Sequence, residues 1–168
     1  MRSLRETLPH ALQLGAEGER VAARFLRRRG YKVLYRNFQP VHGGQVDLVC
    51  RVRRRPELVF VEVKTRSNEA FGAPQEAVSA AQKRAIVRAA QEWLEMLDHP
   101  EVIARFDIVE VIAHADRWEV HHLENAFLAE ETLHPGSLPA SLEANRAVAR
   151  PTHGRAGAGR FRRRAPRC

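Results

Sequence analysis

The sequence contains few cysteines, no long hydrophobic run and no apolar segment at its N-terminus. Cys50 falls inside a predicted strand and Cys168 is the last residue, so the two cysteines make no disulfide framework. No stretch approaches the roughly eighteen apolar residues of a membrane helix, and the opening residues lack the apolar region of a secretory signal. We therefore expect a cytoplasmic protein without a membrane partner.

Several common catalytic motifs are also missing. The chain has no Walker loop, no Rossmann glycine pattern and no Gly-x-Ser-x-Gly sequence. Its eight histidines are scattered, and the adjacent His121 and His122 would point to opposite faces of a strand. No zinc site is therefore indicated by spacing.

The positive charge is concentrated at one end of the chain. The net charge is +8, but the segment from Arg150 onward holds seven of the 28 basic residues and no acidic one, which leaves 21 basic against 20 acidic side chains. From Pro151 the composition is mainly Gly, Ala, Arg and Pro, which buries too little apolar surface to fold. We expect a lead-in at 1–13, one domain at 14–128 and a disordered basic tail at 129–168.

Hydrophobic periodicity predicts two helices and five strands within that domain. The helices are expected at 13–29 and 79–97, the second with an N-cap at Ser79, and the strands at 31–38, 45–52, 58–64, 105–112 and 118–123. The last strand is shorter and is expected at the edge of the sheet. This order is typical of an α/β or α+β fold with a mixed central β-sheet flanked by helices.

The strand at 58–64 carries charge where a buried strand is usually apolar. Its run of apolar residues is interrupted by Glu62 and Lys64, which lie two residues apart and so share one face of the strand. Burial of unpaired charge is costly. The pair is therefore either a structural ion pair or part of a functional site.

The preceding strand adds a second carboxylate. If the two strands form an antiparallel hairpin across the turn at 53–56, Asp47 lies opposite Glu62 and Gln45 lies opposite Lys64. Carboxylates held that close repel by about 4 kcal/mol at an effective dielectric near 20. A proton, the lysine or a divalent cation would relieve the repulsion. A slip of one residue would destroy the alignment.

These residues suggest a metal-dependent hydrolase of phosphodiesters. Asp47 and Glu62 would hold Mg²⁺ or Mn²⁺ through oxygen ligands, and the metal would activate water and stabilise charge at phosphorus. Lys64 would orient the water or neutralise the developing negative charge. Glu19, on the flank of the first helix's buried face, is either a boundary glutamate paired with an arginine or an auxiliary acid.

Other basic residues are candidates for anion contacts. Lys83 opens the second helix, where a cation opposes the helix dipole, so it is either aimed at an anion or a solvated surface lysine. The tail either makes salt-sensitive contacts to phosphates or is merely solvated. The candidate nucleic-acid contacts are Arg51, Arg53, Arg54, Arg55, Arg162, Arg163 and Arg164.

Taken together, the motifs closely resemble those of the YraN-like family over about residues 12–128. The matching stretches are Gly15-x-x-Gly18-Glu19-x-x-Ala22-Ala23-x-x-Leu26-x-x-x-Gly30-Tyr31, Arg36-Asn37, Gly44-Gln45-Val46-Asp47-Leu48, Phe60-Val61-Glu62-Val63-Lys64-Thr65-Arg66, Lys83, Arg105-Phe106-Asp107 and Asn125-Ala126-Phe127. The resemblance implies a restriction-endonuclease-like fold, distantly similar to archaeal Holliday-junction resolvases. It also implies that Asp47, Glu62 and Lys64 occupy the acid, acid and lysine positions of the PD-(D/E)XK nuclease motif, with Glu19 matching the helix glutamate of the resolvases.

The chain departs from the family pattern near its first acid. No proline precedes Asp47, and Gln45 stands where the family usually has glutamate in Gly-Glu-x-Asp. An amide oxygen is a weaker metal ligand than a carboxylate, so this change bears on metal affinity more than on fold.

The resemblance implies a Mg²⁺- or Mn²⁺-dependent nuclease acting on DNA, with branched or structured DNA as the substrate class. Resolvase-like action would also imply a homodimer. One alternative is a nucleic-acid-binding module that has kept the fold and lost cleavage, and another is a protein-interaction platform.

Overall fold

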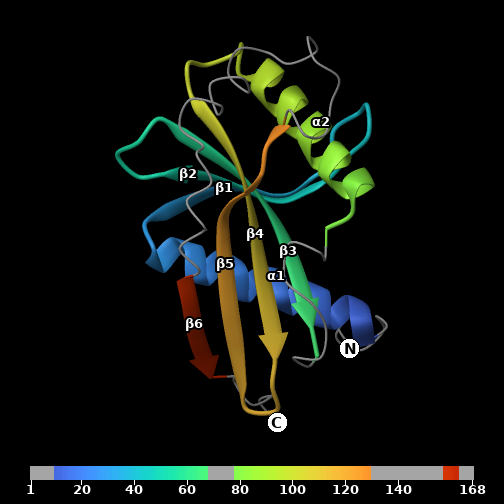
Figure 1. The fold of residues 1–168 in the computed structure, drawn as a ribbon, viewed down its shortest axis with the longest axis vertical. Coiled ribbons are helices and arrows are strands. Elements are labelled where there is room, and N and C mark those ends of the chain that lie inside the picture. Colours follow the sequence, from blue (N-terminus) through green and yellow to red (C-terminus); the bar gives the residue numbers. More distant parts are fainter. Residues whose placement is uncertain (1–9, 68–77, 130–156, 163–168) are drawn as a thin grey trace, which may run out of the picture.

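The computed structural model describes residues 10–67, 78–129 and 157–162. Two helices lie on a sheet, and the two ends of the sheet fan apart (Figure 1). The elements are α1 (His10–Arg28), β1 (Tyr31–Phe38), β2 (Val46–Val52), β3 (Glu57–Arg66), α2 (Ala80–Met96), β4 (Ile103–Ala113), β5 (Arg117–Phe127) and β6 (Gly157–Arg162).

The six strands follow the order β1-β2-β3-β4-β5-β6 in a single sheet. Only β3 and β4 run parallel, and every other neighbouring pair is antiparallel. A parallel pair requires a crossover connection, and α2 lies within that connection. The predicted mixed central sheet flanked by helices is therefore confirmed, and the architecture is consistent with a restriction-endonuclease-like fold.

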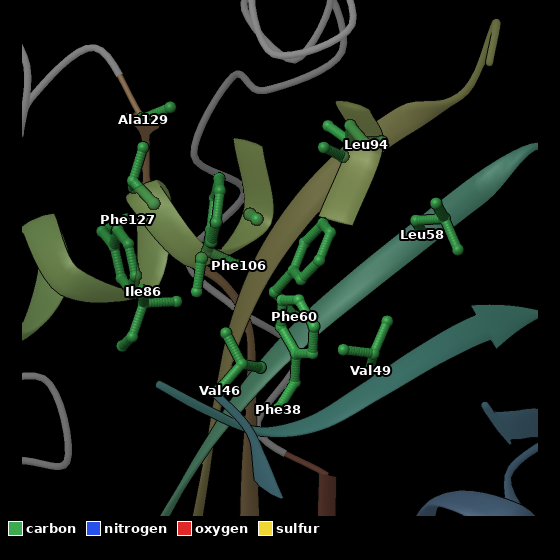
Figure 2. Packing of buried hydrophobic residues seen from close by; sticks show 14 of the residues in the cluster. Phe38, Val46, Val49, Leu58, Phe60, Ile86, Leu94, Phe106, Phe127 and Ala129 are labelled. Carbon is green, nitrogen blue, oxygen red and sulfur yellow. The ribbon is translucent and has the colours of Figure 1, made fainter. Parts of the chain in front are cut away.

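Alternate residues of β3 divide the core into two layers. Phe60, Phe106 and Phe127 pack together under α2 (Figure 2). The ring centroids of Phe60 and Phe106 are 5.7 Å apart, and those of Phe106 and Phe127 are 5.1 Å apart. Val59 and Val61 point to the other face, toward the apolar side of α1. Since both faces of β3 are covered, a charged residue on this strand can reach solvent only near the strand's end.

The start of α2 agrees with the predicted capping box. The Ser79 hydroxyl accepts a hydrogen bond from the Gln82 backbone N–H at 3.2 Å, and the Gln82 side chain accepts one from the Ser79 N–H at 3.1 Å. These bonds satisfy backbone groups that the first helical turn leaves unpaired. The start of this helix was thus correctly predicted from sequence.

The sheet extends one strand further than predicted. The strand expected at the edge spans Arg117–Phe127, and β6 pairs along its outer side. Gly157–Arg162 falls within the tail predicted to be disordered, so that prediction was wrong for these six residues. The prediction of disorder considered only how much apolar side-chain surface the segment can bury, whereas the exposed edge of β5 also offers it backbone hydrogen bonds. Residues 130–156 and 163–168 of the predicted tail lie outside the described residues.

Within the described ranges, neither helix combines the length and the apolar character that crossing a membrane requires.

Candidate functional site

The predicted register of the β2–β3 hairpin is confirmed. Leu48 pairs with Val61 and Arg51 pairs with Leu58, as the four-residue turn required. The ladder of paired residues ends at Leu48, which directly follows Asp47 in the chain. At that point Asp47 Oδ2 accepts a hydrogen bond from the backbone N–H of Val63 at 2.8 Å. At the point where β2 and β3 separate, the Asp47 side chain thus accepts a backbone hydrogen bond in place of a strand carbonyl.

Glu62 and Lys64 form the ion pair that their spacing allowed. Lys64 Nζ lies 2.9 Å from Glu62 Oε1, and both side chains are largely buried. Asp47 is 8% exposed. Glu62 thus has a cation as its partner, whereas within the described structure Asp47 is bound only by the uncharged Val63 N–H and Gln45 amide, which leaves the group with an excess of negative charge when all three are ionised.

This imbalance is reflected in the pKa of Asp47. Burial and the charge of Glu62 raise that pKa from 3.8 to about 7, with a further contribution from the charge of Glu19. Hydrogen bonds from the Val63 N–H and from the side chain of Gln45 oppose the rise. Asp47 consequently takes up a proton near neutral pH, and a cation bound beside it would favour the ionised carboxylate instead.

Glu19 reaches the site because α1 packs closely on the end of β3. A Cβ added at Gly18 would overlap the side chain of Thr65, so only glycine allows this approach. The Glu19 carboxylate then accepts a hydrogen bond from Asn37 Nδ2 at 3.0 Å and lies 3.8 Å from Arg36 Nη2. Sequence reasoning assigned no role to Arg36 or Asn37, although the Arg36-Asn37 pair was one of the family-like motifs.

Gln45 is oriented as a donor toward the acid. Its side-chain Nε2 donates to Asp47 Oδ1 at 3.3 Å, and its Oε1 accepts from Gln39 Nε2 at the same distance. The network turns the amide nitrogen, and not the oxygen, toward Asp47. In this arrangement Gln45 supports the carboxylate and does not supply a third oxygen ligand.

The other predicted residues lie away from this group. Lys83 Nζ stands 5.4 Å from the centre of the Phe127 ring, a cation–π contact on the α2 side of the sheet. The arginines at 51 and 53–55 are exposed at the opposite end of the hairpin. Arg162 is the last residue of β6, and Arg163 and Arg164 fall outside the described residues.

The donor set suits a cation that keeps much of its own water. Across the described ranges, no three His, Cys, Asp or Glu side chains come together as a metal-binding group. Asp47 and Glu62 supply two carboxylates. Magnesium is commonly held by one or two carboxylates with several retained waters, so the residues present fit such an ion.

A second charged network, missed from sequence, lies in the core on the α1 side of the sheet, where Asp107 of β4 pairs with Val61 of β3. Fully buried Asp107 accepts hydrogen bonds from Arg105 Nε at 2.9 Å and from the Asn125 backbone N–H at 2.9 Å, and its Oδ2 lies 2.8 Å from His122 Nε2. Burial alone would raise the pKa of Asp107, but the bond with His122 and the charge of Arg105 hold it below its ordinary value. The network ties β4 to β5 and explains how charges are accommodated in a core strand.

Comparison with known proteins places most of this domain in one family. The model of the uncharacterised protein family UPF0102 matches residues 18–111. A UPF0102 protein of Syntrophotalea carbinolica is 47% identical over 117 residues, covering 69% of this chain and 92% of the relative. UPF0102 proteins of Geobacter metallireducens and Pelobacter propionicus are each 39% identical, covering 70% and 71% of this chain and 94% and 85% of their own lengths.

Proposed function

The chain belongs to the uncharacterised protein family UPF0102, the YraN-like family of the predicted resemblance, and we propose that it is a divalent-metal-dependent nuclease. Its substrate would be DNA, with branched or structured DNA the first class to test, and its reaction the hydrolysis of phosphodiester bonds. The observation that carries this proposal is the buried carboxylate pair of Asp47 and Glu62 beside a single lysine. The cytoplasmic setting and the homodimer remain predictions from sequence.

Asp47 and Glu62 would hold Mg²⁺ or Mn²⁺. When bound, such an ion lowers the pKa of a coordinated water and stabilises negative charge on a phosphoryl group. Because the pKa of Asp47 is about 7, the carboxyl would release its proton as the ion binds, so affinity would rise with pH through neutrality.

The remaining residues would position the reactants. Lys64 donates to Glu62 and so holds one carboxylate in place, while its charge is available to the oxygens of a phosphodiester at the same face. Glu19 adds negative charge near Asp47, and the Asn37 amide fixes its orientation. In this assignment Lys64 stabilises charge and Glu19 is an auxiliary acid.

The principal alternative is a nucleic-acid-binding module of the same fold without cleavage. Gln45 favours it, since its side chain points an N–H group at Asp47 where a glutamate would add an oxygen ligand. The alternative keeps the fold and any contacts to phosphates but loses the metal chemistry.

The test is cleavage of single-stranded, duplex, flap and four-way-junction DNA in Mg²⁺, Mn²⁺ or EDTA. Lys64→Ala is compared with Lys83→Ala, which makes the same change at a lysine resting on Phe127. We expect metal-dependent cutting in wild type and in Lys83→Ala, and none in Lys64→Ala. Equal cutting in both variants would refute the assignment of Lys64, and binding without cutting in either metal would favour the binding module.

Metal binding is tested separately by calorimetry with Mn²⁺. We expect binding by wild type and none by Asp47→Ala or Glu62→Ala, because each variant removes one of only two carboxylate ligands. Unchanged binding in both variants would show that the ion, if any, binds elsewhere.

A further inference from the structure

Exposed basic side chains gather on the side of the molecule away from the candidate site. The last turn of α1, the β2–β3 turn and β6 all lie on the left in Figure 1, while β3 ends on the right. The Arg53 backbone N–H bonds to the Gly30 carbonyl at 3.2 Å and joins the β2–β3 turn to the end of α1. We call this surface the arginine face, and its exposed members are Arg27, Arg28, Arg29, Lys32, Arg51, Arg53, Arg54 and Arg160. Arg55 of the same turn lies 3.6 Å from Glu57 Oε1 and is not counted among them.

The charge of the arginine face is not neutralised within the described structure. Across residues 10–67, 78–129 and 157–162, no carboxylate forms a salt bridge with any of its eight members. Lys32 and Arg51 even lie directly opposite each other across β1 and β2, an arrangement that destabilises a sheet. The dipole of α1 favours cations in its last turn but accounts neither for the hairpin residues nor for Arg160. A polyanion is the partner that this charge fits.

Two of these arginines are held in fixed orientations by aromatic rings. Arg29 Cζ lies 4.7 Å from the centre of the Phe25 ring, and Arg28 Cζ lies 5.0 Å from that of Phe161. The two rings meet edge to face with centroids 6.1 Å apart. A guanidinium stacked on a ring keeps the N–H groups at its rim available for phosphate oxygens. The stacking therefore prepares both arginines for phosphate at little cost in side-chain entropy.

Strand β6 supplies half of that support. Phe161 belongs to β6 and pairs with Trp118 of β5. A Cβ added at Gly159 would stand 2.6 Å from Phe25 Cε2, so glycine allows β6 to pack this closely on α1. The arginine face thus depends on a strand that lies beyond the 18–111 range of the family match.

We propose that the arginine face binds the phosphate backbone of a duplex arm that extends from the reacting phosphodiester at Asp47 and Glu62, with β6 completing the surface. This inference rests on the proposed function for the position of the reacting bond. From Asp47 to Arg53, six residues of strand span about 20 Å. From Glu19 to Arg28, nine residues of helix span about 14 Å. At about 3.4 Å per base pair, the two sites lie about four to six base pairs apart on a duplex.

The first experiment measures the salt dependence of binding to a fluorescent 20-base-pair duplex in EDTA. The double variant Arg28→Ala/Arg29→Ala is compared with Arg84→Ala/Arg88→Ala, which loses the same charge from exposed positions on α2. Each lost phosphate contact lowers the log–log slope by about 0.9, so we expect the first variant to lose about 1.8 and the second to match wild type. Equal slopes in wild type and both variants, or a loss confined to the α2 variant, would overturn the proposal.

The second experiment isolates the contribution of β6 without changing charge. Phe161→Ala removes the ring under Arg28 and is expected to weaken duplex binding at least several-fold, whereas Phe161→Tyr is expected to bind like wild type. Equal binding by both variants would remove β6 from the site. Comparing duplex arms of 3 and 12 base pairs tests the spacing, because only the longer arm reaches from Asp47 to the arginine face.

Failure of this inference is distinguishable from failure of the proposed function. Binding in EDTA requires no cleavage, so altered slopes in a protein that cuts nothing would support the arginine face and count against the nuclease. Cutting that depends on Lys64, together with salt slopes that are the same in wild type and in the Arg28→Ala/Arg29→Ala variant, would support the nuclease and count against the arginine face.

Discussion

Replacement of Asp47 by asparagine is expected to stabilise the metal-free protein while abolishing the proposed metal binding. Asparagine keeps the size of the side chain and its Oδ1 can still accept the Val63 N–H, while its amide group replaces the oxygen that accepts from Gln45. A pKa raised from 3.8 to about 7, at 1.36 kcal/mol per pH unit, corresponds to about 4 kcal/mol of unfavourable charge in the folded state. We expect a gain of about 1 to 4 kcal/mol at pH 8, because relaxation around the charge reduces this upper limit.

The dependence on pH gives the sharper test. Folded Asp47 binds its proton more tightly than the unfolded chain does, so its contribution to stability is greatest below pH 4. That contribution is lost as pH rises from about 4 to about 7 and is constant above this range. The Asp47→Asn variant lacks this loss, and its advantage over wild type should therefore grow between pH 4.5 and pH 8.

Urea unfolding in EDTA, followed by the fluorescence of Trp93 and Trp118, measures this difference directly. Other titrating groups contribute equally to both proteins and cancel in the comparison. An advantage of the same size at both pH values, or a variant less stable than wild type at pH 8, would refute the electrostatic reasoning for Asp47. Added Mg²⁺ should then raise the stability of wild type alone, since only wild type retains both proposed ligands.

Three further substitutions probe the site and its support. Gln45→Glu should tighten Mn²⁺ binding at pH 8 by about tenfold in calorimetry, because it adds a third carboxylate beside those of Asp47 and Glu62; unchanged affinity would exclude this position from the metal's surroundings. Gly18→Ala should cost about 1 to 3 kcal/mol in urea unfolding because of the Thr65 side chain, whereas Gly15→Ala, with no described atom within 4 Å of the added Cβ, should be neutral or stabilising; equal effects would argue against close packing. Asp107→Ala should cost about 3 to 5 kcal/mol, since it leaves Arg105 buried without its main partner, and a loss below about 1 kcal/mol in the same assay would show that the network adds little.

The hairpin that carries the candidate site was predictable because its information is local. A strand's period of two and a four-residue turn suffice to bring Asp47, Glu62 and Lys64 to one face, and the observed pairing follows that arithmetic. The raised pKa of Asp47 was also foreseeable in direction, since two carboxylates were expected at close range. Local periodicity gave the two helices and five of the six strands for the same reason.

Contacts between distant segments were not predictable in the same way. His122 lies fifteen positions beyond Asp107, and Phe161 follows Phe25 by more than a hundred residues, so no local pattern pairs them. The position of Lys83 over Phe127 likewise depends on how α2 packs on the sheet. Strand β6 was missed because a glycine- and arginine-rich composition does not show that a neighbouring strand edge is available.

The length of the turn at 53–56 fixes which residues of β3 lie opposite Asp47. One residue added there, if a four-residue turn still formed, would shift β3 by one position against β2 and rotate Glu62 and Lys64 to the α1 side of the sheet, with Phe60 turned away from the α2 side. Two added residues would restore the face but move both side chains about 7 Å along the strand, away from Asp47. The proposed chemistry therefore depends on the length of a loop that contains none of the proposed catalytic residues. A change in the length of this loop that shifts the register would therefore separate Asp47 from Glu62 and Lys64.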